Sequence, residues 1–183
     1  MSLTWVPNAL TLSRCVLAIG VGWAVMNWPT QSYLPFVAFV LVAATDFLDG
    51  WAARRLNAVS ELGAFLDPIA DKLLVGAALI ALCLLAGGDL LLWIPTAAII
   101  ARDTIATLLR LVPGLDMPVS QLAKWKTAVE MIGIGALLLA NATAISLIWA
   151  LGLGLVWLAA ALSVYTLGLY IGALIADRKR PHS

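Results

Sequence analysis

The fold is decided by two apolar stretches, residues 33–53 with the sequence YLPFVAFVLVAATDFLDGWAA and residues 62–86 with the sequence LGAFLDPIADKLLVGAALIALCLLA. Each is longer than 20 residues. An α-helix of that length rises about 1.5 Å per residue and can cross about 30 Å of hydrocarbon. A short segment containing Arg54 and Arg55 separates the two stretches. They therefore predict two neighbouring, antiparallel membrane-spanning helices.

The remainder of the chain is also rich in apolar residues. Of its 183 residues, 63% are hydrophobic and 11% are charged, whereas about a quarter of the residues of a soluble globular domain are charged. Further apolar stretches cover residues 7–28, 90–111, 122–140 and 145–176. The sequence therefore predicts an all-α, polytopic membrane protein with six transmembrane helices, built as a single membrane domain over residues 1–183.

The charges are sorted between alternate connections. Residues 28–32, 87–89 and 141–143 contain no Lys or Arg. The basic residues gather in the other connections and at the C-terminal end, as Arg54, Arg55, Arg110, Lys124, Lys126, Arg178, Lys179 and Arg180. Because cytoplasmic loops carry the excess of Lys and Arg, both termini are expected in the cytoplasm. The compact chain favours a bacterial inner (cytoplasmic) membrane, and its net charge of +1 gives no sign of a nucleic-acid partner.

Four aspartates lie within the two stretches that decide the fold, and a carboxylate in the membrane needs a compensating cation. Asp46 and Asp49 are three positions apart, and Asp67 and Asp71 are four apart, so each pair shares one helical face. Asp49 and Asp67 are expected about 7 Å below the connecting loop, with Asp46 and Asp71 at a matching deeper level. The four carboxylates can therefore converge on one point.

Four converging carboxylates cannot all stay ionised unless a divalent cation lies between them. A ligand set made only of oxygen favours Mg²⁺ or Mn²⁺ over zinc. Two alternatives remain open. The aspartates can form buried salt bridges with Arg54, Lys72 or Arg102 that fix helix packing, or they can line the ion path of a cation transporter.

The spacing of these residues has the form DxxDGxxAR, eight further residues, and then GxxxDxxxD, over residues 46–71. This pattern resembles the signature of the CDP-alcohol phosphotransferases (CDP-alcohol phosphatidyltransferases) at every defining position. Residues 7–14 and the expected six-helix layout are also similar to the family. The resemblance covers essentially the whole chain.

The resemblance implies transfer of a phosphatidyl group from CDP-diacylglycerol to an alcohol, with release of CMP and with a divalent metal. It implies that Asp46, Asp49, Asp67 and Asp71 bind the metal and that Asp71 is the general base. It places the CDP pocket at Asn8, Thr11, Asp49, Gly50, Ala53, Arg54, Gly63 and Asp67. It also implies a homodimer among membrane lipids, and the small residues Gly168 and Gly172 can seat a helix of the same chain or of a partner.

Within the family, the chain is most similar to phosphatidylglycerophosphate synthases, through residues 67–72, 109–110 and 124–127 and an acid after Arg102. This similarity implies sn-glycerol 3-phosphate as the acceptor. Its dianionic phosphate needs a cluster of cations. The residues expected to bind it are Arg110, Lys124, Lys126 and Arg102, although Asp103 or Glu130 could neutralise Arg102. Inositol phosphate, serine and phosphatidylglycerol remain alternative acceptors.

Overall fold

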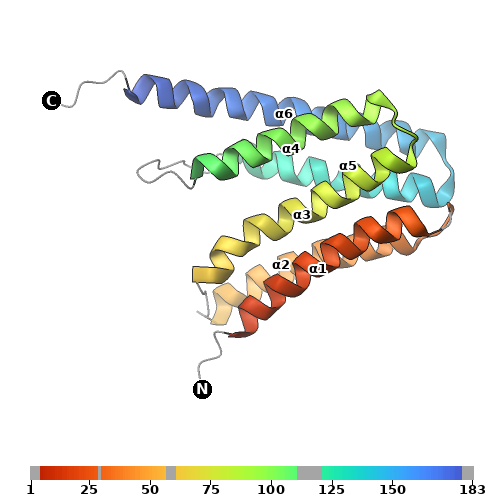
Figure 1. Ribbon diagram of the computed structural model, residues 1–183, viewed down its shortest axis with the longest axis horizontal. Helices are drawn as coiled ribbons and strands as arrows, with labels where there is room; N and C mark the ends of the chain where they lie inside the picture. Colours follow the sequence, from red (N-terminus) through yellow and green to blue (C-terminus); the bar gives the residue numbers. More distant parts are fainter. Residues whose placement is uncertain (1–4, 29, 57–60, 111–120, 179–183) are drawn as a thin grey trace.

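The computed structural model describes residues 5–28, 30–56, 61–110 and 121–178, and these residues form helices and no strand. Figure 1 shows the helices in chain order. They are α1 (Trp5–Asn27), α2 (Leu34–Leu56), α3 (Glu61–Leu85), α4 (Leu90–Arg110), α5 (Gln121–Thr143) and α6 (Ser146–Arg178). The prediction of an all-α chain with six helices is confirmed.

Two helix ends differ most from the apolar stretches in the sequence. Helix α2 continues through Arg54 and Arg55 to Leu56, because arginine and leucine favour a helix as well as most residues do. Helix α5 runs to Thr143 through residues expected to form a turn. The Thr143 hydroxyl donates a hydrogen bond to the Leu139 carbonyl at 2.9 Å within that last turn. Polar residues at the end of an apolar stretch thus do not by themselves end a helix.

Successive helices run in opposite directions along the bundle (Figure 1). The first turn of α1 and the last turn of α6 lie at the same end. The end of α2, the start of α3, the end of α4 and the start of α5 lie there too. This is the arrangement that the sorting of charges predicts, because the basic residues of the sequence cluster around those helix ends.

Two helix pairs carry the tightest packing, α1 with α3 and α5 with α6. A Cβ atom at Gly22 would lie 3.1 Å from the Cβ of Ala77, and one at Gly152 would lie 2.9 Å from the backbone nitrogen of Leu137. Lipid tails are as apolar as leucine, so close packing of this kind holds membrane helices together. In contrast, a Cβ atom at Gly168 or Gly172 would meet open space within the described part of the chain.

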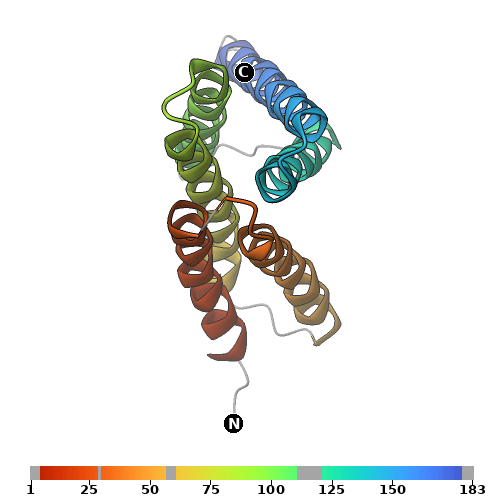
Figure 2. The same ribbon diagram turned by 90° about the vertical axis from the view of Figure 1, so that its right-hand side faces the viewer.

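Helix α2 packs against α1 and α5 but has few contacts with α3. Figure 2 shows α2 diverging from α1 and α3 toward the end of the bundle where the chain begins. The two helices of the aspartate signature are therefore held mainly through α1, which packs along α3, rather than by contact with one another.

By length and composition, two helical segments of the described residues are apolar enough to cross a membrane, Leu90–Leu109 and Ser146–Gly172. Shorter apolar segments occupy Leu12–Asn27 in α1 and Leu34–Thr45 in α2. These helices indicate an association with membranes.

Candidate functional site

The four signature aspartates lie on α2 and α3, near the helix ends that meet at one end of the bundle. Asp46 precedes the last residue of α2 by ten positions, and Asp71 follows the first residue of α3 by ten. Asp49 and Asp67 stand seven and six positions from those same helix ends. At 1.5 Å per residue, Asp46 and Asp71 lie about 15 Å from these helix ends, and Asp49 and Asp67 lie about 10 Å from them. The predicted matching of depths therefore agrees with the helix bounds, although α2 ends three residues later than expected and α3 begins one residue earlier.

The side chain of Asp71 is half-buried on α3, and its charge is near enough to Glu130 of α5 for the two to interact. The side chains of several predicted site residues lie outside the described part of the structure, although their backbones are helical. They are Asn8, Thr11, Asp46, Asp49, Gly50, Ala53, Arg54, Gly63, Asp67, Arg110 and Lys124. Asp71 is thus the signature residue whose surroundings the structure describes.

Among the residues with described side chains, no group of three or more acidic, His or Cys residues is arranged to hold a metal ion. Three of the four predicted ligands, Asp46, Asp49 and Asp67, are not in that set. Their donor chemistry fits Mg²⁺ or Mn²⁺, because all four ligands are carboxylates and they stand at two matched levels of adjoining chain segments. The metal site remains a prediction.

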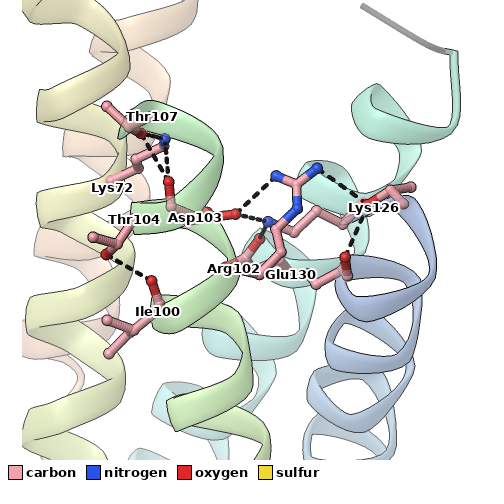
Figure 3. Close-up of polar contacts among 10 residues, drawn as sticks. Lys72, Ile100, Arg102, Asp103, Thr104, Thr107, Lys126 and Glu130 are labelled. Carbon is pink, nitrogen blue, oxygen red and sulfur yellow. Dashed lines mark hydrogen bonds and ion pairs between the residues drawn. The ribbon is translucent and has the colours of Figure 1, made fainter. Parts of the chain in front are cut away.

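A buried ionic cluster joins α4, α5 and α6 beside this level of the bundle (Figure 3). Asp103 Oδ1 accepts hydrogen bonds from Lys126 Nζ at 2.7 Å and from Arg102 Nη1 at 3.0 Å. Lys126 also pairs with Glu130 Oε2 at 3.1 Å, one helical turn further along α5. Arg102 Nη2 donates to Thr166 Oγ1 of α6 at 3.1 Å. Two cations and two carboxylates therefore neutralise one another inside the helix bundle.

This cluster contains two of the four residues predicted to bind the acceptor phosphate. Lys126 is 2% exposed and Arg102 is 8% exposed, and both donate to Asp103. The expectation that an acid neutralises Arg102 is confirmed by Asp103. A phosphate can reach Lys126 or Arg102 only if these ion pairs open, so the structure does not bring them to an accessible surface together. Arg110 and Lys124 stand nearer the helix ends.

The cluster has hydrogen-bonding capacity left over. Arg102 Nε, Glu130 Oε1 and Ser163 Oγ are buried atoms without a partner among the described residues. The guanidinium of Arg102 also lies 5.9 Å from the centre of the Tyr170 ring, a distance typical of a cation–π contact. Arg102 is therefore held by α4 and α6 together.

Lys72, the residue after Asp71, bridges from α3 to α4 (Figure 3). Its ammonium donates to the backbone carbonyl of Asp103 at 2.9 Å and to the Thr107 hydroxyl. From the sequence, Lys72 was a possible salt-bridge partner of the aspartates, and its contact with α4 was not predicted. The pairing of Lys126 with Glu130 was also missed, although their spacing of four positions in a helix was a usable signal.

An apolar groove of about 470 Å³ lies between α3 and α4. Its walls are mostly aliphatic, and Lys72, Asp103, Thr104 and Thr107 contribute the polar part of the lining. Side-chain packing therefore leaves space between these two helices next to the Lys72 bridge.

Comparison with known proteins agrees with the signature. Residues 4–165 match the family model described as CDP-alcohol phosphatidyltransferase. The chain is 37% identical to CDP-diacylglycerol--glycerol-3-phosphate 3-phosphatidyltransferase 2 of Arabidopsis thaliana, over 90% of the chain and 77% of the relative. It is also 37% identical to the CDP-diacylglycerol--glycerol-3-phosphate 3-phosphatidyltransferase of Rickettsia bellii, over 87% of the chain and 90% of the relative.

A third relative carries a different name. The chain is 32% identical to the cardiolipin synthase (CMP-forming) of Oryza sativa subsp. japonica, over 90% of the chain and 56% of the relative. The family match covers most of the chain, and the aspartate signature lies inside the matched residues. On these grounds the chain belongs to the CDP-alcohol phosphatidyltransferase family.

Proposed function

We propose that this protein transfers a phosphatidyl group from CDP-diacylglycerol to sn-glycerol 3-phosphate, giving phosphatidylglycerophosphate and CMP. The observation that carries the proposal is the complete aspartate signature of residues 46–71. The chain that contains it matches relatives with that enzyme name over most of their length. Family membership alone leaves the acceptor open, so the choice of glycerol 3-phosphate follows the names of these relatives.

In the proposed reaction, a hydroxyl oxygen of the acceptor forms a bond to the phosphorus that carries the diacylglycerol. The bond from that phosphorus to the oxygen of CMP breaks, and CMP leaves with the electron pair. Asp71 takes the proton of the acceptor hydroxyl, because a carboxylate placed beside a reacting hydroxyl can act as its general base. Asp71 is half-buried at the deeper of the two carboxylate levels, which limits its access to bulk water.

Mg²⁺ or Mn²⁺, held by Asp46, Asp49, Asp67 and Asp71, would neutralise the diphosphate and stabilise the charge of the departing CMP. We assign the CDP moiety to Asn8 and Thr11 of α1 and to the signature residues of α2 and α3. The latter are Asp49, Gly50, Ala53, Arg54, Gly63 and Asp67. The glycines and the alanine leave room for the nucleotide to approach the helix backbones.

The acceptor phosphate is assigned first to Arg110 and Lys124, which stand at the ends of α4 and α5 on the same side as the signature. Lys126 and Arg102 belong to this assignment only after rearrangement of their pairs with Asp103, because both are buried there.

We further propose that all six helices span the membrane, with both termini and the site on the cytoplasmic side of an inner membrane, and that the chain forms a homodimer. The alternating helix directions and the gathering of basic residues at one end of the bundle support this orientation. The open faces at Gly168 and Gly172 are compatible with contact from another helix.

Purified protein supplied with CDP-diacylglycerol and one acceptor at a time tests the proposal, with CMP release as the measurement. We expect release with glycerol 3-phosphate and little with serine or inositol phosphate. Absence of CMP with glycerol 3-phosphate would reject the assigned acceptor. Metal-dependent cation flux into liposomes without CMP release from any acceptor would instead favour the transporter reading of the aspartates.

A second acceptor has its own support. The relative named cardiolipin synthase (CMP-forming) favours phosphatidylglycerol as an alternative acceptor for this chain. The same assay separates the two, because phosphatidylglycerol would give CMP without any glycerol 3-phosphate present.

A further inference from the structure

We propose that Lys72 and Thr107 are positioning residues, which hold the turn of α3 that carries Asp71 in register with α4. The proposal rests on the function proposed above, in which Asp71 works at the reacting centre. It assigns the action of Thr107 to its contact with Lys72 rather than to any contact with substrate.

The bridge between α3 and α4 consists of two hydrogen bonds from one ammonium group. Lys72 Nζ donates to the Asp103 carbonyl at 2.9 Å and to the Thr107 hydroxyl, which in turn donates to that same carbonyl at 2.8 Å. Asp71 and Lys72 are neighbours in one hydrogen-bonded turn of α3, so they move as one unit. An ammonium held at two points therefore limits both rotation and sliding of the α3 turn that carries Asp71.

The turn of α4 that accepts the Lys72 bridge is held rigidly. The α4 turn that receives Lys72 is itself fixed by the Asp103 carboxylate, which binds Lys126 of α5 and Arg102. Arg102 continues to Thr166 of α6. The bridge thus ties α3 to a turn that two further helices hold in place.

Side-chain packing between α3 and α4 is loose at the level of the bridge. The groove of about 470 Å³ lies between α3 and α4 at this point. Residues such as Leu73 and Leu108, 37% and 59% exposed, line it without filling it. Because packing leaves space there, the polar bridge sets the register of α3 against α4.

Thr104 supplies a matched control for Thr107 (Figure 3). Both threonines lie on α4 and line the groove, and both hydroxyls donate to the carbonyl four residues earlier at 2.8 Å. Within the described contacts, the Thr104 hydroxyl bonds only to Ile100, whereas the Thr107 hydroxyl also accepts from Lys72. Replacing either by valine removes a hydroxyl of the same kind from the same helix, but only one change removes the bridge.

The test compares Thr107→Val, Thr104→Val and Thr107→Ser in the purified full-length protein. We expect Thr107→Val to lower kcat for CMP release about tenfold to a hundredfold, the scale of a small misplacement of a reacting group. The KM values for both substrates should stay within about twofold, because the variant leaves ground-state binding intact. Thr104→Val should keep wild-type kcat, and Thr107→Ser should restore it.

Three kinetic results would overturn the positioning role. These are equal kcat values for Thr107→Val and Thr104→Val, a change confined to KM, or failure of Thr107→Ser to restore turnover when the variant is folded. A double variant, Lys72→Met with Thr107→Val, should be about as slow as the slower single variant, since both changes break one bridge. Multiplied losses would also contradict a shared bridge.

Mn²⁺ affinity, measured by the paramagnetic resonance of the free ion, keeps the test independent of the proposed reaction. If wild-type protein binds Mn²⁺ but releases no CMP with any acceptor, the proposed reaction fails. The positioning role then stands if Thr107→Val alone weakens Mn²⁺ binding, and falls if Thr107→Val and Thr104→Val bind it equally. Wild-type protein that neither binds Mn²⁺ nor releases CMP would reject both proposals.

Discussion

The carboxylates of α4 and α5 differ from those of α2 and α3 in how their charge is balanced. Asp103 and Glu130 lie against Lys126, and Asp103 also binds Arg102, so two acids meet two bases within the chain. Residues 46–72 hold five acidic and three basic residues, an excess of two negative charges (3 − 5 = −2). One of those bases, Lys72, extends to α4.

The difference separates a structural use of membrane carboxylates from a chemical one. A cluster that neutralises itself has no need of an outside ion, and its value lies in joining three helices. For a stretch with excess negative charge at matched depths, we expect a bound divalent cation to supply the compensation. We therefore expect the two regions to respond differently to perturbation.

Removal of divalent cations should give the largest effect, because only the aspartates of α2 and α3 are expected to depend on a bound cation for charge balance. Chelation by EDTA should abolish CMP release, and excess Mg²⁺ or Mn²⁺ should restore it. Helicity, followed by circular dichroism, should stay unchanged because the α4–α6 cluster balances itself. Full activity in a metal-free enzyme would remove the distinction between the two regions.

Asp71→Asn should lower kcat about a thousandfold, since the amide cannot accept the proton of the acceptor hydroxyl. Equilibrium binding of CDP-diacylglycerol should remain within a few-fold of wild type. Asp89→Asn is a suitable control, because Asp89 is an exposed acid at the start of α4, far along the chain from the signature, and accepts from the Leu91 backbone nitrogen at 2.9 Å. Substantial turnover in Asp71→Asn would argue that another group takes the proton.

Lys126→Met should act on stability, because it leaves Glu130 buried without its cation and removes one of two cations from Asp103. Breaking a buried ion pair from one side typically costs about 3–5 kcal/mol in the free energy of unfolding. Adding Glu130→Leu to Lys126→Met should recover part of that loss, since the second change removes the stranded carboxylate. Thermal or denaturant unfolding in detergent measures both. A neutral Lys126→Met would contradict the description of the cluster as self-balanced.

Gly152→Ala should give the smallest effect of the series, about 1–3 kcal/mol of lost stability from overpacking where α6 meets α5. The new Cβ atom would lie 2.9 Å from the backbone nitrogen of Leu137, which cannot move easily. Gly154→Ala is the matched control, because its Cβ atom would meet open space. Equal unfolding midpoints for the two variants would show that the scaffold of the ionic cluster is looser than this packing implies.

The sequence predicted the helices well because each needs a long apolar run, and such runs are visible without knowledge of packing. The depth matching of Asp46 with Asp71 also needed only the helical rise, so it agrees with helix bounds that differ from the expected ones by one to three residues. The pairing of Arg102 with an acid was foreseen because Asp103 is its neighbour in the chain.

Contacts between helices could not be read in the same way. Nothing in the composition of α2 and α3 says that α1 packs along α3 while α2 makes few contacts with it. Lys126 was placed in an acceptor site because the dianionic phosphate of the acceptor needs a cluster of cations. Its burial depends on which face of α5 turns toward α4 and α6. The bridge from Lys72 to Thr107 joins residues 35 positions apart with no sequence pattern to mark it.

Helix α6 has one further consequence, for the bilayer itself. Its apolar segment Ser146–Gly172 has 27 residues. At the rise of an α-helix this segment is about 40 Å long, roughly 10 Å more than an average hydrocarbon layer. A helix of this length that spans such a layer has to tilt, kink or locally thicken the lipid around it. The tilt of α6 should therefore depend on bilayer thickness, and lipids with longer acyl chains should reduce it.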